Sequence, residues 1–327
     1  MRTQWIFVCA IASCLASSAF GQTDPPDPWL DLMNKATALD KAGDYPRAIL
    51  IYRQAAAMVE GPGSRRLAIS LNALANAEDQ LGRNADSEAL FKRAVAIAGR
   101  NGIYDALYGL TLSNFGVHYL EFGEPDKARG LLSEAVGILT RVMPPDSVQL
   151  ALTRNALGNL LMNDGDFDQA EKLIEASITT YRKNADPKSD ELAVGLNNLG
   201  VVRRHQGRSD EALQLFQQSI ELVETTLGPD HPSLLRALAN LGTVYGESGR
   251  REEADAAFQR ALSIGEKRLG TTHPIYALVL LNYSRFLRAS GQKRKAKTLE
   301  ARANALLHEH SVTNGTGMTI DVSSFRH

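Results

Sequence analysis

The chain has 327 residues, of which 44% are hydrophobic and 22% are charged, and its formal net charge is −1. This composition is typical of a folded protein and argues against intrinsic disorder. General electrostatic binding to nucleic acid or to acidic membranes requires a strong basic excess, which this chain lacks. We therefore expect no nucleic-acid partner.

The first 21 residues have the pattern of a secretory signal peptide. Arg2 precedes an apolar run at residues 5–15, and the small residues Ala19 and Gly21 follow where a signal peptidase would cut. The run is too short to span a bilayer, so no membrane span is expected. The sequence predicts that residues 1–21 are removed and that the mature chain is exported, either to the periplasm or out of the cell.

Both cysteines of the chain, Cys9 and Cys14, lie within this segment. Cleavage after Gly21 would leave the mature chain without a thiol for a disulfide or for thiol chemistry. An alternative follows from residues 11–14, which resemble a bacterial lipobox. In that interpretation Cys14 is the lipidated first residue of a membrane-anchored lipoprotein, although its early position in the chain argues against this.

Two segments flank the folded domain that we predict at residues 29–309. Residues 22–28 (QTDPPDP) are rich in proline and predict a linker. The sequence TNGTG at residues 313–317 is expected to end the last helix, and residues 310–327 form a C-terminal tail. The weak alternation at residues 318–325 fits a strand-like cap on the last repeat, and a disordered tail fits it equally well.

Between these segments a glycine returns seven times, at Gly43, Gly82, Gly123, Gly165, Gly207, Gly249 and Gly291. The intervals are 39, 41 and then 42 residues four times. A small residue stands seven positions before each glycine, and Ala or Ser stands five and twelve positions after it. Small residues at fixed places in a periodic unit let helices pack closely. The pattern therefore predicts a solenoid of helix pairs and not a globular enzyme core.

The unit at residues 189–228 shows the local physics most clearly. Apolar residues at three- and four-residue spacing predict a first helix, which Gly207 ends. A second helix is expected from Asp210, and Pro232 is expected in the first turn of the helix that follows. The two helices of the unit should approach closely at Gly200, where a larger side chain would push them apart.

These features resemble the tetratricopeptide repeat (TPR) family, whose paired helices meet at such small residues. The 42-residue period, with LNNLG at residues 196–200 and TLGPDHP at residues 226–232, is most similar to the repeats of kinesin light chain and its bacterial relatives. The aromatic residue usual in the second helix is present as Tyr52, Phe91, Phe216 and Phe258, and is replaced by Leu132, Ile174 and Glu300. The resemblance implies an all-α fold, a right-handed superhelical solenoid of seven antiparallel helix pairs. It also implies that the first helices line a concave groove that holds an extended peptide.

Asparagines recur on the predicted first helices, close to the small packing residue. The peptide-binding residues that we predict among them are Asn72, Asn114, Asn155, Asn159, Asn198, Asn240 and Asn282. Asparagine is unfavourable inside helices, so its return in successive units needs a cause. Its amide donates and accepts, as a peptide bond does, and by resemblance such asparagines hold cargo peptides in kinesin light chain. The alternative is that these amides bond to the backbone of the adjacent repeat and only stabilise stacking.

Four arginines belong to the same helices in the C-terminal half, Arg204, Arg236, Arg285 and Arg288, and we predict the first three as binding residues. By resemblance they face the groove, where they would favour an acidic segment or a C-terminal carboxylate. The alternative is that they are ordinary surface arginines interspersed with acidic residues.

The sequence predicts no catalytic residue, no metal and no cofactor. His231 and His273 each precede a proline at a helix start, which indicates a repeated capping element. His308 and His310 lack the i, i+4 spacing that places two ligands on one helix face. We therefore expect an exported, non-catalytic adaptor that binds a peptide or extended segment of another protein. The alternative is an envelope-assembly or scaffold component, anchored through Cys14, that binds a folded partner through its outer face.

Overall fold

The computed structural model describes residues 27–61, 64–184 and 190–314. Within these ranges the chain forms fourteen α-helices and one short 3-10 helix, and it contains no strand. The predicted signal peptide (residues 1–21) and the tail beyond Asn314 lie outside the described residues, as does all of the predicted linker except Asp27 and Pro28. The predicted all-α fold of seven helix pairs is confirmed.

Each pair consists of a first helix and a second helix. The first helices are α2 (Pro28–Lys41), α4 (Arg65–Gln80), α6 (Ala106–Glu121), α8 (Val148–Asn163), α10 (Glu191–His205), α12 (Leu234–Glu247) and α14 (Pro274–Ala289). The second helices are α3 (Tyr45–Met58), α5 (Asn84–Ala98), α7 (Pro125–Val142), α9 (Phe167–Lys183), α11 (Ser209–Thr226), α13 (Arg251–Arg268) and α15 (Lys293–Asn314). The 3-10 helix η1 (Arg100–Gly102) follows α5. Among the described helices, none is both long enough and apolar enough to cross a bilayer.

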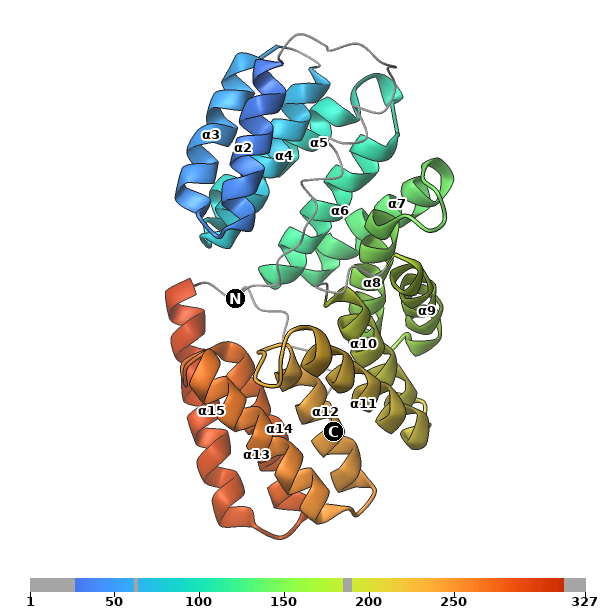
Figure 1. Ribbon diagram of the computed structural model, residues 1–327, viewed down its shortest axis with the longest axis vertical. Helices are drawn as coiled ribbons and strands as arrows, with labels where there is room; N and C mark the ends of the chain where they lie inside the picture. The colour runs from blue at the N-terminus through green and yellow to red at the C-terminus, as the bar shows by residue number, and fades with distance from the viewer. Residues whose placement is uncertain (1–26, 62–63, 185–189, 315–327) are drawn as a thin grey trace. The chain divides into compact units, whose positions relative to one another are not determined.

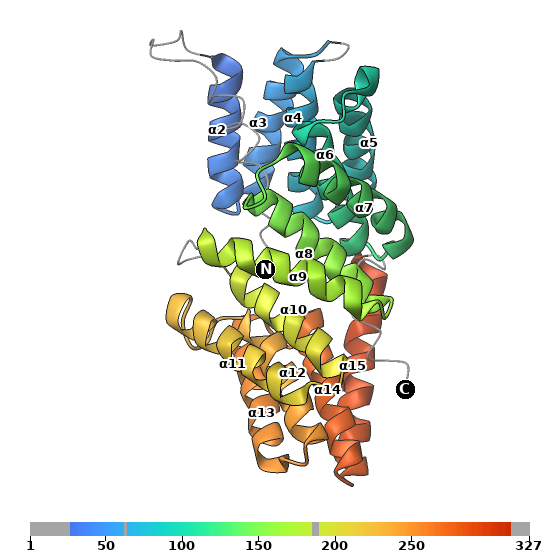
Figure 2. The same ribbon diagram turned by 90° about the vertical axis from the view of Figure 1, so that its right-hand side faces the viewer.

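The chain divides into two compact units, Met1–Thr153 and Arg154–His327, with the boundary inside α8. In the first unit α4 packs against α3, α5 and α6, and α6 packs against α7 (Figure 1). In the second unit α12 packs against α11 and α13, and also against α10 and α14 (Figure 2). In these examples each first helix therefore contacts its own second helix and the neighbouring first helix.

The recurring glycine forms the turn inside each pair. All seven copies have a positive φ, between 74° and 86°, which L residues with a side chain rarely adopt. In the fifth pair the N–H of Arg208 donates to the carbonyl of Arg203 at 2.8 Å, and the N–H of Gly207 donates to Arg204 at 3.0 Å. This is the Schellman arrangement, in which a left-handed residue satisfies the last carbonyls of a helix. The predicted role of the glycine is confirmed.

In the four first helices whose small residue is glycine, that glycine faces a large side chain of its own second helix. A Cβ atom added at Gly200 would lie 2.6 Å from Cε1 of Phe216, which is fully buried. A Cβ at Gly116 would lie 2.7 Å from Leu132. Close approach at the small position is therefore confirmed, and the side chain it admits is the one at the usual aromatic position.

The two His-Pro motifs share one contact, since Nδ1 of His231 accepts from the N–H of Ser233 at 3.3 Å as Nδ1 of His273 accepts from Ile275, but their helices begin at different positions. His273 caps α14, since its Nδ1 accepts from the N–H of Ile275 at 3.2 Å, and Pro274 is the first helical residue as expected. The expectation for Pro232 is wrong, because α12 begins two residues later, at Leu234. There the N–H of Leu234 donates to the carbonyl of His231, and the N–H of Leu235 donates to Pro232, both at 3.1 Å. These i to i+3 bonds form a turn that delays the helix.

Candidate peptide-binding face

In the second unit, four of the asparagines on first helices form a continuous chain of hydrogen bonds. Asn240 of α12 donates from Nδ2 to Oδ1 of Asn197 in α10 at 2.9 Å. Asn197 donates to Asn198 at 3.5 Å, and Asn198 donates to Oδ1 of Asn155 in α8 at 3.3 Å. We call these four residues the amide chain. It crosses three consecutive first helices, with every donor pointing towards α8.

In the first unit the corresponding contact is a single pair. Asn114 of α6 donates from Nδ2 to Oδ1 of Asn72 in α4 at 3.2 Å. Both side chains are buried, with exposed fractions of 1% for Asn72 and 3% for Asn114. Desolvation of these amides is offset because each meets another amide.

These bonds bear directly on the two explanations that the sequence leaves open. The amides do link adjacent repeats, as the stacking alternative expects. Their partner, however, is an asparagine side chain of the neighbouring repeat and not its backbone. Asn159 and Asn282 are half-buried on the same set of helices and take no part in the amide chain. Contact of any of these residues with a peptide stays a prediction.

Pairing does not exhaust the hydrogen-bonding capacity of the amide chain. A carboxamide has two N–H donors and two acceptor lone pairs. Asn197 and Asn198 each spend one donor and one lone pair within the chain, so one of each kind is left on both residues. Both side chains are buried, with exposed fractions of 8% and 7%. Asn240, at the donor end of the chain, is half-buried.

The three predicted arginines have different surroundings. Arg204 pairs with Glu247 of α12, with 2.8 Å between Nη1 and Oε1, so its charge is already matched by the neighbouring first helix. Arg236 is exposed and Arg285 is half-buried. A role in attracting an acidic ligand stays a prediction for all three.

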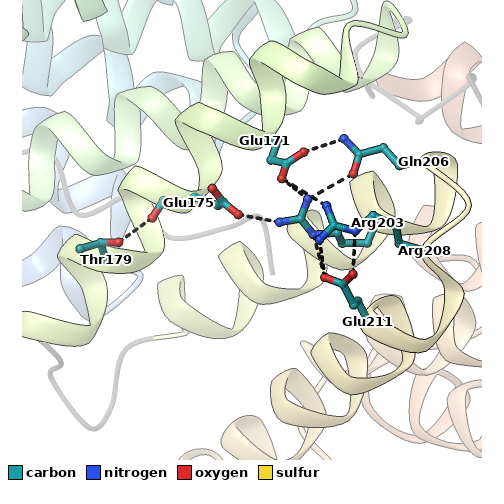
Figure 3. Close-up of polar contacts among 7 residues, drawn as sticks. All are labelled: Glu171, Glu175, Thr179, Arg203, Gln206, Arg208 and Glu211. Atoms are coloured by element: carbon teal, nitrogen blue, oxygen red, sulfur yellow. Dashed lines mark hydrogen bonds and ion pairs between the residues drawn. The ribbon is translucent and has the colours of Figure 1, made fainter.

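Arg203, which sequence reasoning missed, is the centre of a buried ion-pair network (Figure 3). Its exposed fraction is 6%. It pairs with Glu171 and, at 2.6 Å, with Glu175, both on α9, and its Nε lies 3.5 Å from Glu211 of α11. The network therefore connects three successive helices. The only sequence signal is the spacing of Glu171 and Glu175, one turn apart on α9.

The pKa of Glu171 follows from its position in this network. Burial alone would raise the pKa, but hydrogen bonds from Gln206 and Arg203 stabilise the carboxylate and hold the pKa below its ordinary value. The Gln206 Nε2 donates to Oε2 of Glu171 at 2.6 Å. The Glu171 carboxylate is thus charged at neutral pH. All its described contacts lie within the network, so it stabilises the packing of these helices.

The part of the chain that the structure describes contains no cluster of three or more His, Cys, Asp or Glu residues that could hold a metal ion.

Comparison with known proteins decides the family. Two sequence profiles, each described as a tetratricopeptide repeat, match the chain. One matches residues 66–141, 149–224 and 191–267, and the other matches residues 32–66, which together make up more than half of the chain. The chain belongs to the tetratricopeptide repeat family. No curated protein sequence matches this TPR chain.

Solved structures with the same fold include other TPR proteins. The nearly identical TPR-like repeats of a kinesin light chain from Podosopora anserina match at a TM-score of 0.53 and 22% identity, covering 64% of this chain and 97% of that one. BtubC (BKLC) from P. vanneervenii matches at a TM-score of 0.56 and 23% identity, covering 70% of this chain and 91% of that one. The Rap conjugation gene regulator of plasmid pLS20, in complex with the Phr* peptide, matches at a TM-score of 0.55 and 15% identity. The match covers 76% of this chain and 64% of that one. At these identities the likeness shows the fold.

Proposed function

We propose that this TPR chain is a non-catalytic adaptor that binds an extended segment of another protein along its first helices. The observation that carries the proposal is the amide chain, in which Asn197 and Asn198 each keep one N–H and one lone pair. A peptide bond presents the matching acceptor and donor. Neighbouring helices lie ~8–10 Å apart and an extended chain advances ~3.3 Å per residue, so each first helix would meet about every third residue of the segment.

The relatives support the same function. The Rap regulator with a similar fold is bound to the Phr* peptide, which supports a peptide as the ligand class here. Repeats of helix pairs offer extended surfaces suited to binding. The non-catalytic part of the proposal rests on the sequence, which contains no recognisable arrangement of catalytic residues.

The proposal can be tested with a peptide selected from a random library against the full mature chain. Asn240→Ala removes the accessible donor end of the amide chain, and we expect it to weaken binding of the selected peptide at least tenfold, or about 1.4 kcal/mol. Asn304→Ala is the matched control, because Asn304 is exposed on a second helix. Calorimetric titration of the three proteins measures the difference. Failure to select any peptide, or equal affinity of all three proteins, would contradict the proposal.

We further propose that the chain is exported after removal of residues 1–21. The proposal rests on Arg2, the apolar run at residues 5–15 and the small residues at the cleavage position. Mass spectrometry of the chain purified from its native envelope should find Gln22 as the first residue. A diacylated Cys14 would contradict removal after Gly21 and would favour the alternative of a lipid-anchored scaffold.

A further inference from the structure

The last helix of the second unit has an exposed face that carries charge of one sign. α15 packs mainly against α14 (Figure 1). Between residues 293 and 308 its exposed positions hold five cations and no acidic residue. We call these five side chains the basic face: Lys293, Arg294, Lys295, Lys297 and Arg302.

The charge of the basic face is not matched within the part of the chain that the structure describes. None of its five side chains forms an ion pair with a described carboxylate. Arg302 instead lies over the ring of Tyr276, with its Cζ 5.4 Å from the ring centroid. The acidic residue of α15 nearest to these cations, Glu300, is half-buried and pairs with Arg288 of α14.

The stability of α15 does not account for these cations. Like charges on one helix face repel, and cations in the first turn of a helix are opposed by the helix dipole. The first turn contains Asp210 and Glu211 in α11 and Glu252 and Glu253 in α13, whereas α15 has no acidic residue there. A face of mixed charge would avoid both costs, so the uniform sign has another cause.

The composition of α15 around the basic face indicates the kind of partner. The other exposed positions between residues 293 and 308 hold Thr298, Ala301, Asn304, Ala305 and His308. None of these is a large apolar side chain that could anchor a protein interface, and none is a Phe, Tyr or Trp that could stack on the bases of a single strand. A bilayer with anionic lipids matches such a face, because its attraction adds up over Lys and Arg residues and needs no complementary shape.

We propose that the basic face docks this chain on the surface of a bilayer that contains anionic lipids. The contact is electrostatic, and among the described helices none is able to cross the bilayer. The net charge of −1 for the whole chain does not oppose it, because salt limits the reach of each charge to about 8–10 Å. The inference goes beyond the proposed adaptor function and does not depend on it.

Flotation of the full mature chain with vesicles tests the inference. Vesicles of phosphatidylcholine with about one third phosphatidylglycerol should bind the chain, and vesicles of phosphatidylcholine alone should not. Raising the sodium chloride concentration from about 50 mM to about 500 mM should release the chain, because the added ions screen the attraction.

A fourfold variant locates the surface that binds. Replacing the four cations in the first turns of α15, by Lys293→Gln, Arg294→Gln, Lys295→Gln and Lys297→Gln together, should lower the affinity for anionic vesicles at least about tenfold. The matched control replaces four exposed cations on α2, α9 and α13, by Lys35→Gln, Lys172→Gln, Lys183→Gln and Arg251→Gln. It changes the net charge by the same amount and should bind almost as well as the unmodified chain.

Circular dichroism checks that both variants are folded. Since the substituted cations of α15 are opposed by the helix dipole, their removal should not lower the melting temperature. If a variant is unfolded, the dependence of binding on anionic lipid and on salt in the unmodified chain decides alone.

The inference is overturned if the chain does not bind anionic vesicles, if the two variants lose binding equally, or if binding survives the high salt concentration. A glutamate-rich peptide and a DNA duplex are tested in parallel. Binding of either probe that is tighter than binding to the vesicles, and that the fourfold variant loses, would also overturn it. Peptide binding that depends on Asn240 is measured separately, so the adaptor function and the basic face succeed or fail independently.

Discussion

Asp40 shows how the packing of one residue sets its charge. It lies in the last turn of α2, and Oη of Tyr52 donates to its Oδ2 at 3.4 Å. Burial raises the pKa of Asp40 from its ordinary value to about 6, and the hydrogen bond from Tyr52 offsets only part of that effect. In the unfolded chain the same carboxyl group titrates near its ordinary value, so folding disfavours its ionisation.

This difference gives a pH dependence of stability. Since the folded pKa is the higher one, the unfolded state loses the proton first as the pH rises, and stability falls between about pH 4 and about pH 6. Asp40→Asn keeps an acceptor for Tyr52 and removes the titration. At neutral pH the variant should be more stable by about 1–2 kcal/mol, a value reduced for partial contact with solvent.

Thermal unfolding of both proteins across that pH range measures the effect. The two stabilities should converge below about pH 4, where Asp40 is protonated in both states. Parallel curves over the whole range would show that Asp40 ionises in the folded protein as easily as in the unfolded one.

At the scale of one element, the sequence predicts the structural features that depend on residues close together in the chain. The glycine period predicts every turn between the helices of a pair, and the small residue before it predicts where the two helices meet. Both depend on backbone sterics and on helix periodicity, which a sequence displays. Pro232 was misplaced because the N–H of Leu235 bonds to the carbonyl of Pro232 and prolongs the turn, whereas after His273 the N–H of Ala277 bonds to the carbonyl of His273 and continues the helix.

The candidate site was predicted less completely, because its contacts cross between helices. The asparagines recur in register, but their pairing with one another depends on how closely successive first helices approach. Arg203 has acidic partners on both α9 and α11, and His118 reaches Asp79 from 39 positions away. No periodic pattern connects such residues, so only the three-dimensional arrangement reveals them.

At the scale of the whole molecule, the described helices make their most extensive contacts with helices that are close to them in sequence. Helices pack against the next helix along the chain, or against the next first helix. A chain of this kind is stabilised by each pair and by its interfaces with the adjacent pairs. A local defect should therefore destabilise its own neighbourhood and leave distant repeats unchanged.

Gly200→Ala tests this expectation in the second unit. The added Cβ would lie 2.6 Å from the ring of Phe216, and such overpacking costs about 1–3 kcal/mol. Hydrogen exchange should accelerate in α10, α11 and the helices packed against them, and should stay unchanged in α2 to α5.

Gly130→Ala is the matched control, because Gly130 lies within α7 and no atom would lie within 4 Å of its added Cβ. There the same substitution should slow exchange locally, since alanine is favoured over glycine in a helix by about 1 kcal/mol. Adding Phe216→Leu to Gly200→Ala should recover part of the loss, as expected for two residues in direct contact. Equal acceleration across both units in Gly200→Ala would show instead that the chain unfolds as one cooperative block, in which stability is shared over all seven pairs.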